Sequence, residues 1–422
     1  MRRRIGTALA VALLGAPLAT LPVASGAQAG PAHPTMVSTN PVDWTPHVLD
    51  GTVWAIAVVG ETVVVGGDFT TVTDSAGANR VPRRYLFAYG LRDGRILPWA
   101  PTVDRPVYTL TAGPDNTVYV GGWFLKVNGA AQRGVARISL VDGSRTPGFN
   151  ARINWGDVRA LAVVHGSLYI GGTFTAINGV PRVALARVNA VTGALDTGFD
   201  ARLAAPGMRR ARVEDFAVTA DGRRLVVIGA IRSAGGVPRN QLAVLHISGP
   251  GAVVLNWHTD TFNAGCMAGF DTYLRGVDFS PAGDYFVVVA TGRATGPTLP
   301  CDAAMRFDLA GVGLHRPVWV NRTGGDSLYS VSVTGPAVYV GGHQRWMNNA
   351  YGKETAGPGA VARSGVAALN PVNGLVLPWN PGKSRGVGTQ ALVASSAGLF
   401  IGSDTETLAG ERHARLGHFP LP

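Results

Sequence analysis

The chain has few of the residues that usually build catalytic or metal centres. It has only two cysteines, Cys266 and Cys301, and only three lysines among its 422 residues. It contains no H-E-x-x-H string and no EF-hand loop, and its histidines lie apart, without the spacing of metal ligands. These absences favour a protein that is not an enzyme and that binds neither metal nor cofactor.

Long apolar runs are also missing after residue 29, so no membrane-spanning helix is expected there. The first 29 residues differ, because MRRR precedes an apolar run that ends in the small-residue string Ala27–Ala29. This order is typical of a secretory signal peptide, and two prolines within the run disfavour a stable helix. We expect cleavage after Ala29, a linker over residues 30–39 and a secreted, extracellular protein.

The positive charge is spread rather than clustered. The net charge is +11, and loss of residues 1–29 removes three arginines and no acid, which leaves +8. No run of basic residues with interleaved aromatics occurs, although a nucleic-acid groove would need one. We therefore expect no nucleic-acid partner, and we expect a monomer.

A glycine motif repeats along the chain. The string LYIGGTF at 168–174 has close copies at 63–69, 118–124 and 338–342, and weaker ones at 226–230, 287–291 and 399–403. The first small residues of the copies are Gly66, Gly121, Gly171, Gly229, Ala290, Gly341 and Gly402. Their intervals of 55, 50, 58, 61, 51 and 61 residues are close to the period of kelch-like propeller blades.

Further strands accompany each copy. An apolar string precedes each motif and begins at Val53, Val107, Val158, Val213, Leu274, Leu328 and Thr389. A third strand and a hairpin turn follow, and an aromatic residue then marks a fourth strand at Trp99, Phe149, Phe199, Trp257, Trp319 and Trp379. Radial repetition of such units predicts an all-β protein, a seven-bladed β-propeller of four-stranded antiparallel blades over residues 40–422.

The last unit ends after its third strand, near residues 414–419. The missing strand is found at the other end of the chain, where NPVDW at 40–44 is similar to VLPWN at 376–380. We expect this N-terminal strand to complete the last blade, because such closure removes an open sheet edge.

The segment at 168–199, LYIGGTFTAINGVPRVALARVNAVTGALDTGF, resembles the delta-60 repeat of secreted bacterial β-propellers. The central GGxF and the following NG-x-x-R carry the resemblance, which is best in the second and third units. It implies an extracellular propeller whose role is largely unassigned, and it implies no catalytic residues.

The double glycines favour a scaffold role, because no helix follows them to bind an anion. A better candidate site is the second position of each first strand, where the framework repeats but the residues do not. We define these residues as the ring: Trp54, Tyr108, Arg159, Glu214, Arg275, Tyr329 and Gln390. We expect them to meet at one mouth of the central channel as a ligand-binding surface, or to plug the channel without binding anything.

Two further features lie outside the ring. The long loop at 343–365 carries Trp346 and Tyr351, which are candidates for contact with carbohydrate or protein. Cys266 and Cys301 are expected to form a disulfide, the default for two cysteines in an exported protein.

Three functions remain open. The first is a secreted, non-enzymatic binding module for a carbohydrate, a cell-envelope component or a protein. The second is a hydrolase or lyase that uses Glu214 as acid or base and Arg159 and Arg275 as anion binders. The third is a structural envelope protein whose ring is inert.

Overall fold

The computed structural model describes residues 30–266, 269–293 and 295–422. Strands dominate these ranges, and the helical element found within them is a 3-10 turn at Thr261–Asn263. The predicted signal peptide, residues 1–29, lies outside the described residues. The protein is therefore all-β in the part that the structure describes.

Antiparallel sheets repeat along the chain, and in each the first two strands form a hairpin to which a third strand is added. The first three sheets are β2 (Val53–Val59), β3 (Thr62–Gly67) and β6 (Leu86–Gly90); β7 (Val107–Gly113), β8 (Thr117–Gly122) and β11 (Val135–Ser139); and β12 (Val158–Val164), β13 (Ser167–Gly172) and β16 (Leu185–Asn189). Two sheets with a fourth strand follow: β17 (Arg212–Val218), β18 (Arg224–Ala230), β21 (Leu242–His246) and β22 (Val253–Val254); and β24 (Leu274–Phe279), β25 (Tyr285–Ala290), β26 (Ala303–Asp308) and β28 (Trp319–Arg322). The last two are β29 (Leu328–Val333), β30 (Val338–Gly342) and β33 (Val366–Leu369); and β34 (Thr389–Ser395), β35 (Gly398–Ser403) and β38 (Leu416–Pro420).

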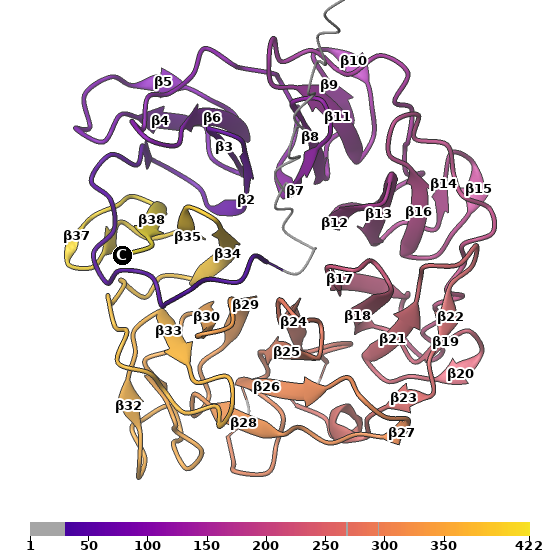
Figure 1. Ribbon diagram of the computed structural model, residues 1–422, viewed down its shortest axis with the longest axis vertical. Coiled ribbons are helices and arrows are strands. Elements are labelled where there is room, and N and C mark those ends of the chain that lie inside the picture. The colour runs from indigo at the N-terminus through magenta and orange to yellow at the C-terminus, as the bar shows by residue number, and fades with distance from the viewer. Residues whose placement is uncertain (1–29, 267–268, 294) are drawn as a thin grey trace, which may run out of the picture.

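These sheets stand around a common axis, with their first strands innermost (Figure 1). The first strand of each sheet contacts the first strand of the next sheet, and β34 in turn contacts β2. The sheets therefore form a closed circle. Radial sheets of this kind are the architecture of a β-propeller.

The expected fourth strand is shorter than predicted in several sheets. After the hairpin turn, pairing is reduced to single bridges such as Tyr89–Ile96, Ile138–Arg145 and Leu369–Val376. A proline follows each of these bridges within two residues, at positions 98, 147 and 378. The bridge Val188–Leu195 is equally short although no proline follows it, so proline alone does not account for the short fourth strand.

The N-terminal segment lies beside the last strand of the chain, as Figure 1 also shows. The N–H groups of Ser38 and Val42 donate to the carbonyls of Pro420 and His418, at 2.8 and 2.9 Å. Within the predicted linker, Val37 is buried and its N–H donates to the Tyr339 hydroxyl at 2.9 Å. Residues 33–42 are thus tied to the sheets near the end of the chain.

Aromatic side chains connect neighbouring sheets. Each of several outer indole N–H groups donates to a backbone carbonyl of the next sheet or of the N-terminal segment: Trp99 to Ser139 at 2.8 Å, Trp257 to Asp308 at 3.1 Å, and Trp379 to Ser38 at 2.8 Å. The apolar core follows the same pattern, because buried clusters such as that of Val107, Val120 and Phe124 include residues of two adjacent sheets. The outer aromatics therefore serve sheet-to-sheet packing.

Each glycine of the pair is required for a different close contact. A Cβ added to Gly171 would lie 2.8 Å from Cγ1 of Val213 in the next sheet. A Cβ added to Gly172 would lie 2.1 Å from the carbonyl oxygen of Asp157 in its own sheet. The first glycine thus permits close approach of the neighbouring sheet, and the second permits close approach of the backbone before the first strand.

The alignment of two copies in the sequence was wrong by one residue. Gly229 pairs with Val213, and Ala290 pairs with Leu274, which is the place of the second glycine in the other sheets. The first place is therefore held by Ile228 and Val289, which are branched residues that the search for a small residue passed over. At these two positions a branched side chain packs against the next sheet in place of glycine.

Candidate functional site

Each ring residue lies in a β-bulge. In every first hairpin the pairing register shifts between the residues on either side of the ring residue, for example between Val158 and Ala160. The residue between them is the ring residue, which has no partner in the ladder. Bulges turn a side chain away from its regular direction, which explains how these side chains can face the axis.

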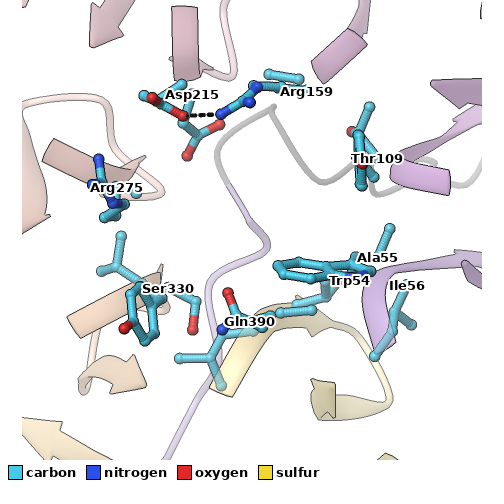
Figure 2. Close-up of a pocket in the computed structure, with 18 of the residues that line it drawn as sticks. Trp54, Ala55, Ile56, Thr109, Arg159, Asp215, Arg275, Ser330 and Gln390 are labelled. Atoms are coloured by element: carbon cyan, nitrogen blue, oxygen red, sulfur yellow. Dashed lines mark hydrogen bonds and ion pairs between the residues drawn. The ribbon is translucent and has the colours of Figure 1, made fainter. Parts of the chain in front are cut away.

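All seven ring residues line one cavity of about 600 Å³ (Figure 2). Each is half-buried. The volume falls within the range of about 300–1,000 Å³ that is usual for small-molecule sites. The structure thus brings together every residue that the sequence placed in the ring.

One side of the cavity carries a network of charges. The Glu214 carboxylate accepts from Nη1 of Arg159 and from Nε of Arg212, and Arg159 also contacts Asp157 at 3.1 Å. Burial acts to raise the pKa of Glu214, but the nearby guanidinium groups of Arg159, Arg212 and Arg275 outweigh it and lower that pKa. Burial likewise opposes the charge of Arg159, yet Glu214 and Asp157 raise its pKa overall. Both groups are therefore held in their charged forms.

Arg275 differs from Arg159. Its Nη1 donates to the backbone carbonyls of Thr272 and Leu274, at 3.2 and 3.0 Å, and none of the ion pairs among the described residues includes it. Burial lowers its pKa, and the carboxylate of Glu214 offsets this only in part. Arg275 thus brings a positive charge to the cavity without a carboxylate in direct contact.

The other side of the cavity is aromatic. The rings of Trp54 and Tyr108 meet edge to face with centroids 6.1 Å apart. The Tyr329 ring contacts the imidazole of His343 in the same manner, at 5.6 Å. Figure 2 shows the Trp54 side chain and Gln390 across the cavity from Arg159. Aromatic faces and an amide thus stand opposite the charged network.

Asp215 adds a carboxyl group to the cavity wall, next to Glu214. Its two oxygens accept from the N–H groups of Phe216 and of Val277 in the neighbouring strand β24, at 2.8 and 3.0 Å. Burial raises the pKa of Asp215 to about 7 despite these bonds, and the charge of Glu214 adds to the shift.

Asp278 is a buried carboxyl group that the sequence did not reveal. It accepts from the N–H of Val333 in β29 at 2.8 Å, and burial raises its pKa well above the ordinary value. The only available signal was a carboxylate within the apolar string that begins at Leu274.

The two predicted loop residues lie apart from the cavity. Trp346 belongs to a short hairpin of β31 (Trp346–Met347) and β32 (Val361–Ala362), and the Arg345 guanidinium stacks on its ring at 4.5 Å. Tyr351 is 65% exposed. Neither residue lines the cavity, although the loop reaches the ring at its first residue, His343, which contacts Tyr329.

The disulfide between Cys266 and Cys301 is present, with Cα atoms 5.8 Å apart. It joins the chain before β24 to the loop between β25 and β26. Gly292 lies directly beneath it, because a Cβ there would lie 2.7 and 2.8 Å from the two cysteine Cβ atoms. The predicted pairing is confirmed.

The sequence contains one formal catalytic motif, although we expected no catalytic residues. Residues 382–386 read GKSRG, which has the G-x-S-x-G spacing. However, the Ser384 hydroxyl contacts the backbone of Thr407, and the segment is not a strand-to-helix turn. Among the residues that the structure describes, no group of three or more His, Cys, Asp or Glu side chains could hold a metal ion. Within the same ranges, no helix has the length and apolarity needed to cross a membrane.

Comparison with known proteins supports the propeller fold. Residues 113–149 and 166–199 match the model of a family described as a domain of unknown function (DUF5122) beta-propeller. Two similar solved structures are those titled "Structure of U3-55K" and "Crystal structure of RRP9 WD40 repeats". Each is 12% identical with a TM-score of 0.55, and the match covers 88% and 89% of this chain and 96% of each of those chains. No curated protein sequence matches the chain. At this identity the solved structures show the fold alone.

Proposed function

We propose that the chain is a seven-bladed propeller that binds a ligand in the ring cavity and does not convert it chemically. The observation that carries this proposal is the meeting of seven side chains of five residue types, each in a bulge, around one cavity of small-molecule size. A residue that fills a structural place repeats from sheet to sheet, as the glycines and outer aromatics do. The ring residue changes type from each sheet to the next, which favours selection for a ligand over selection for the fold.

The ionised state of the Glu214 carboxylate favours binding over hydrolysis or a lyase reaction. A general acid needs a proton near neutral pH, but two arginines hold this carboxylate ionised. As a base it is also poorly placed, since its oxygens already accept from Arg159 and Arg212. The network instead presents a fixed pattern of charge, which is what selective binding requires.

The extracellular setting is part of the proposal. A disulfide persists in oxidising compartments, and the N-terminal sequence has the order of a secretory signal. The N-terminal segment would complete the seventh blade through its hydrogen bonds to β38. A monomer is also part of the proposal. Each first strand already has a first strand of this chain on both sides, so none of them is left to pair with a second copy.

A direct test is titration of the protein with a panel of neutral and acidic mono- to tetrasaccharides, followed by tryptophan fluorescence and by NMR of the sugars. Trp54→Ala should abolish binding, because the indole forms one wall of the cavity. Trp346→Ala is the matched control, since it removes the same side chain from outside the cavity. Binding that depends on Trp346 and not on Trp54 would contradict the ring as the site.

A further inference from the structure

The two arginines of the cavity are not equivalent. Arg159 is saturated, because it contacts carboxylates of both Glu214 and Asp157. Among the described residues, Arg275 hydrogen-bonds only to backbone carbonyls, through Nη1, and its guanidinium lies 5.9 Å from the centroid of the Phe270 ring. Those two bonds fix the direction of the guanidinium and leave its remaining N–H groups available to a ligand.

A half-buried guanidinium without a carboxylate partner is costly, because burial penalises a charge that is not compensated. A ligand carboxylate would compensate it and could bind in the bidentate manner for which arginine is suited. The lowered pKa of Arg275 has the same cause and points in the same direction. The cavity thus has a place for one anionic group.

The rest of the lining favours a hydroxylated ring over a purely aromatic one. The indole of Trp54 and the rings of Tyr108 and Tyr329 offer faces and edges to a sugar. Gln390 has no hydrogen-bond partner among the described side chains and can both donate to and accept from hydroxyl groups. Thr109 adds a hydroxyl group to the lining, whereas the Ser330 hydroxyl already donates to the carbonyl of Thr389 at 3.0 Å.

We infer that the ring cavity binds a sugar that carries one carboxylate, a uronic acid, with the carboxylate on Arg275 and the sugar ring against Trp54. This inference rests on the proposed binding function and adds the class of ligand. The ionised Glu214 restricts the ligand to a single nearby anion, because a second carboxylate beside it would be repelled.

The test compares sugars that differ only in this group. Glucuronate and glucose, and likewise galacturonate and galactose, differ by a carboxylate in place of CH₂OH. Isothermal titration of the full chain should show at least one uronate bound at least tenfold more tightly than its neutral partner. Benzoate is the second probe, because it carries the carboxylate on a ring that has no hydroxyl groups.

Arg275→Gln should reduce uronate affinity at least tenfold and abolish the preference over the neutral sugar. Arg223→Gln is the matched control: Arg223 is 69% exposed and lies in the turn between β17 and β18, at the other end of the strand from the ring residue. It should bind uronate as the unchanged protein does. A thermal melt of both variants verifies folding, and Arg275→Lys, which keeps the charge, should restore part of the affinity if the first variant is unstable.

Equal binding of uronate and neutral sugar, or unchanged affinity in Arg275→Gln, would overturn the inference while leaving the binding function in place. Benzoate bound as tightly as uronate would overturn the assignment to a sugar. If neither acidic nor neutral sugars bind, the carbohydrate inference fails. Loss of uronate binding in both Arg275→Gln and Arg223→Gln would show attraction by overall charge and would likewise overturn the inference.

Discussion

Between β13 and β17 two sheets meet through glycine, whereas between β18 and β24 they meet through a branched side chain and a carboxyl group. At the first interface, Gly171 lies against Val213 with no room for a Cβ. At the second, Ile228 holds the place of the glycine, and Asp215 reaches across to the N–H of Val277.

The interface between β25 and β29 repeats the second arrangement. Val289 stands in the place of the glycine, and Asp278 reaches across to the N–H of Val333. The carboxyl bridges thus occur at the two interfaces that lack the first glycine. A branched side chain and a buried carboxyl group thus occupy these two interfaces, where the other sheets present glycine.

The largest expected loss of stability concerns the sheet of β24 and β25, which is one of the two that lack the first glycine. Cys266→Ala/Cys301→Ala should lose about 3–4 kcal/mol of unfolding free energy, because the bond closes a long loop that includes β24 and β25. Denaturant unfolding of the variant and the oxidised protein measures the difference, and reductant should affect only the latter. A loss below about 1 kcal/mol would show that the carboxyl bridges alone hold this part together.

A smaller effect should arise in the regular part. Gly171→Val should cost about 1–3 kcal/mol, because its side chain would overlap Val213 and Phe216. Ile228→Val is the control at the corresponding place, and it should cost only about 0.5–1.5 kcal/mol. Denaturant midpoints decide the matter. Unchanged stability of Gly171→Val would show that this interface has room for a side chain and would contradict the comparison.

The carboxyl bridge predicts a dependence on pH. The pKa of Asp215 rises from 3.8 to about 7 on folding, so the folded state binds the proton more tightly. This contribution to stability is complete below pH 4 and is lost as the pH rises through 7, by at most about 1.4 kcal/mol per pH unit. Unfolding between pH 5 and 8 measures it, and Asp215→Asn should flatten the slope relative to the unchanged protein. Glu214 on the same strand, and Arg275 and Asp278 on β24, are the charged groups around it. An unaltered slope in the variant would assign the dependence to Asp278, the pKa of which burial also raises.

The smallest effect is expected at the ring. Gln390→Ala should change stability by less than about 0.5 kcal/mol, because the residue lies outside the ladder and makes no side-chain hydrogen bond among the described residues. Leu399→Ala, in the adjacent strand and fully buried, should cost about 2–5 kcal/mol. Thermal unfolding separates the two. A large cost at Gln390 would assign the ring to the fold and not to a ligand.

Much of the fold could be predicted because its signals are local. The glycine strings, the hairpin turns and the spaced aromatics each depend on backbone geometry or close packing, so they recur at a readable interval. The alignment failed at Gly229 and Ala290 because a search for small residues cannot tell the first glycine place from the second. Only the pairing register separates them.

The residues that line the cavity together could be predicted from the sequence, but the ion pairs and hydrogen bonds that they make could not. A fixed position in the repeat was enough to collect the ring residues, since the same bulge recurs in each first hairpin. The partners could not be predicted in this way. That Arg159 is neutralised and Arg275 is not depends on Asp157, directly before β12, and on Glu214, which approaches from β17. Asp278 was missed because its partner, Val333, lies in another sheet.

The bulge under each ring residue separates the chemistry of the cavity from the stability of the scaffold. A side chain that takes no part in the ladder can be exchanged while the hydrogen bonds on either side of it, such as those around Val158 and Ala160, remain as they are. Ligand preference can therefore change one position at a time without a new fold at each step. The ring residues can therefore be substituted while the propeller is kept, which suits both natural divergence and the design of new binding specificities on the same fold.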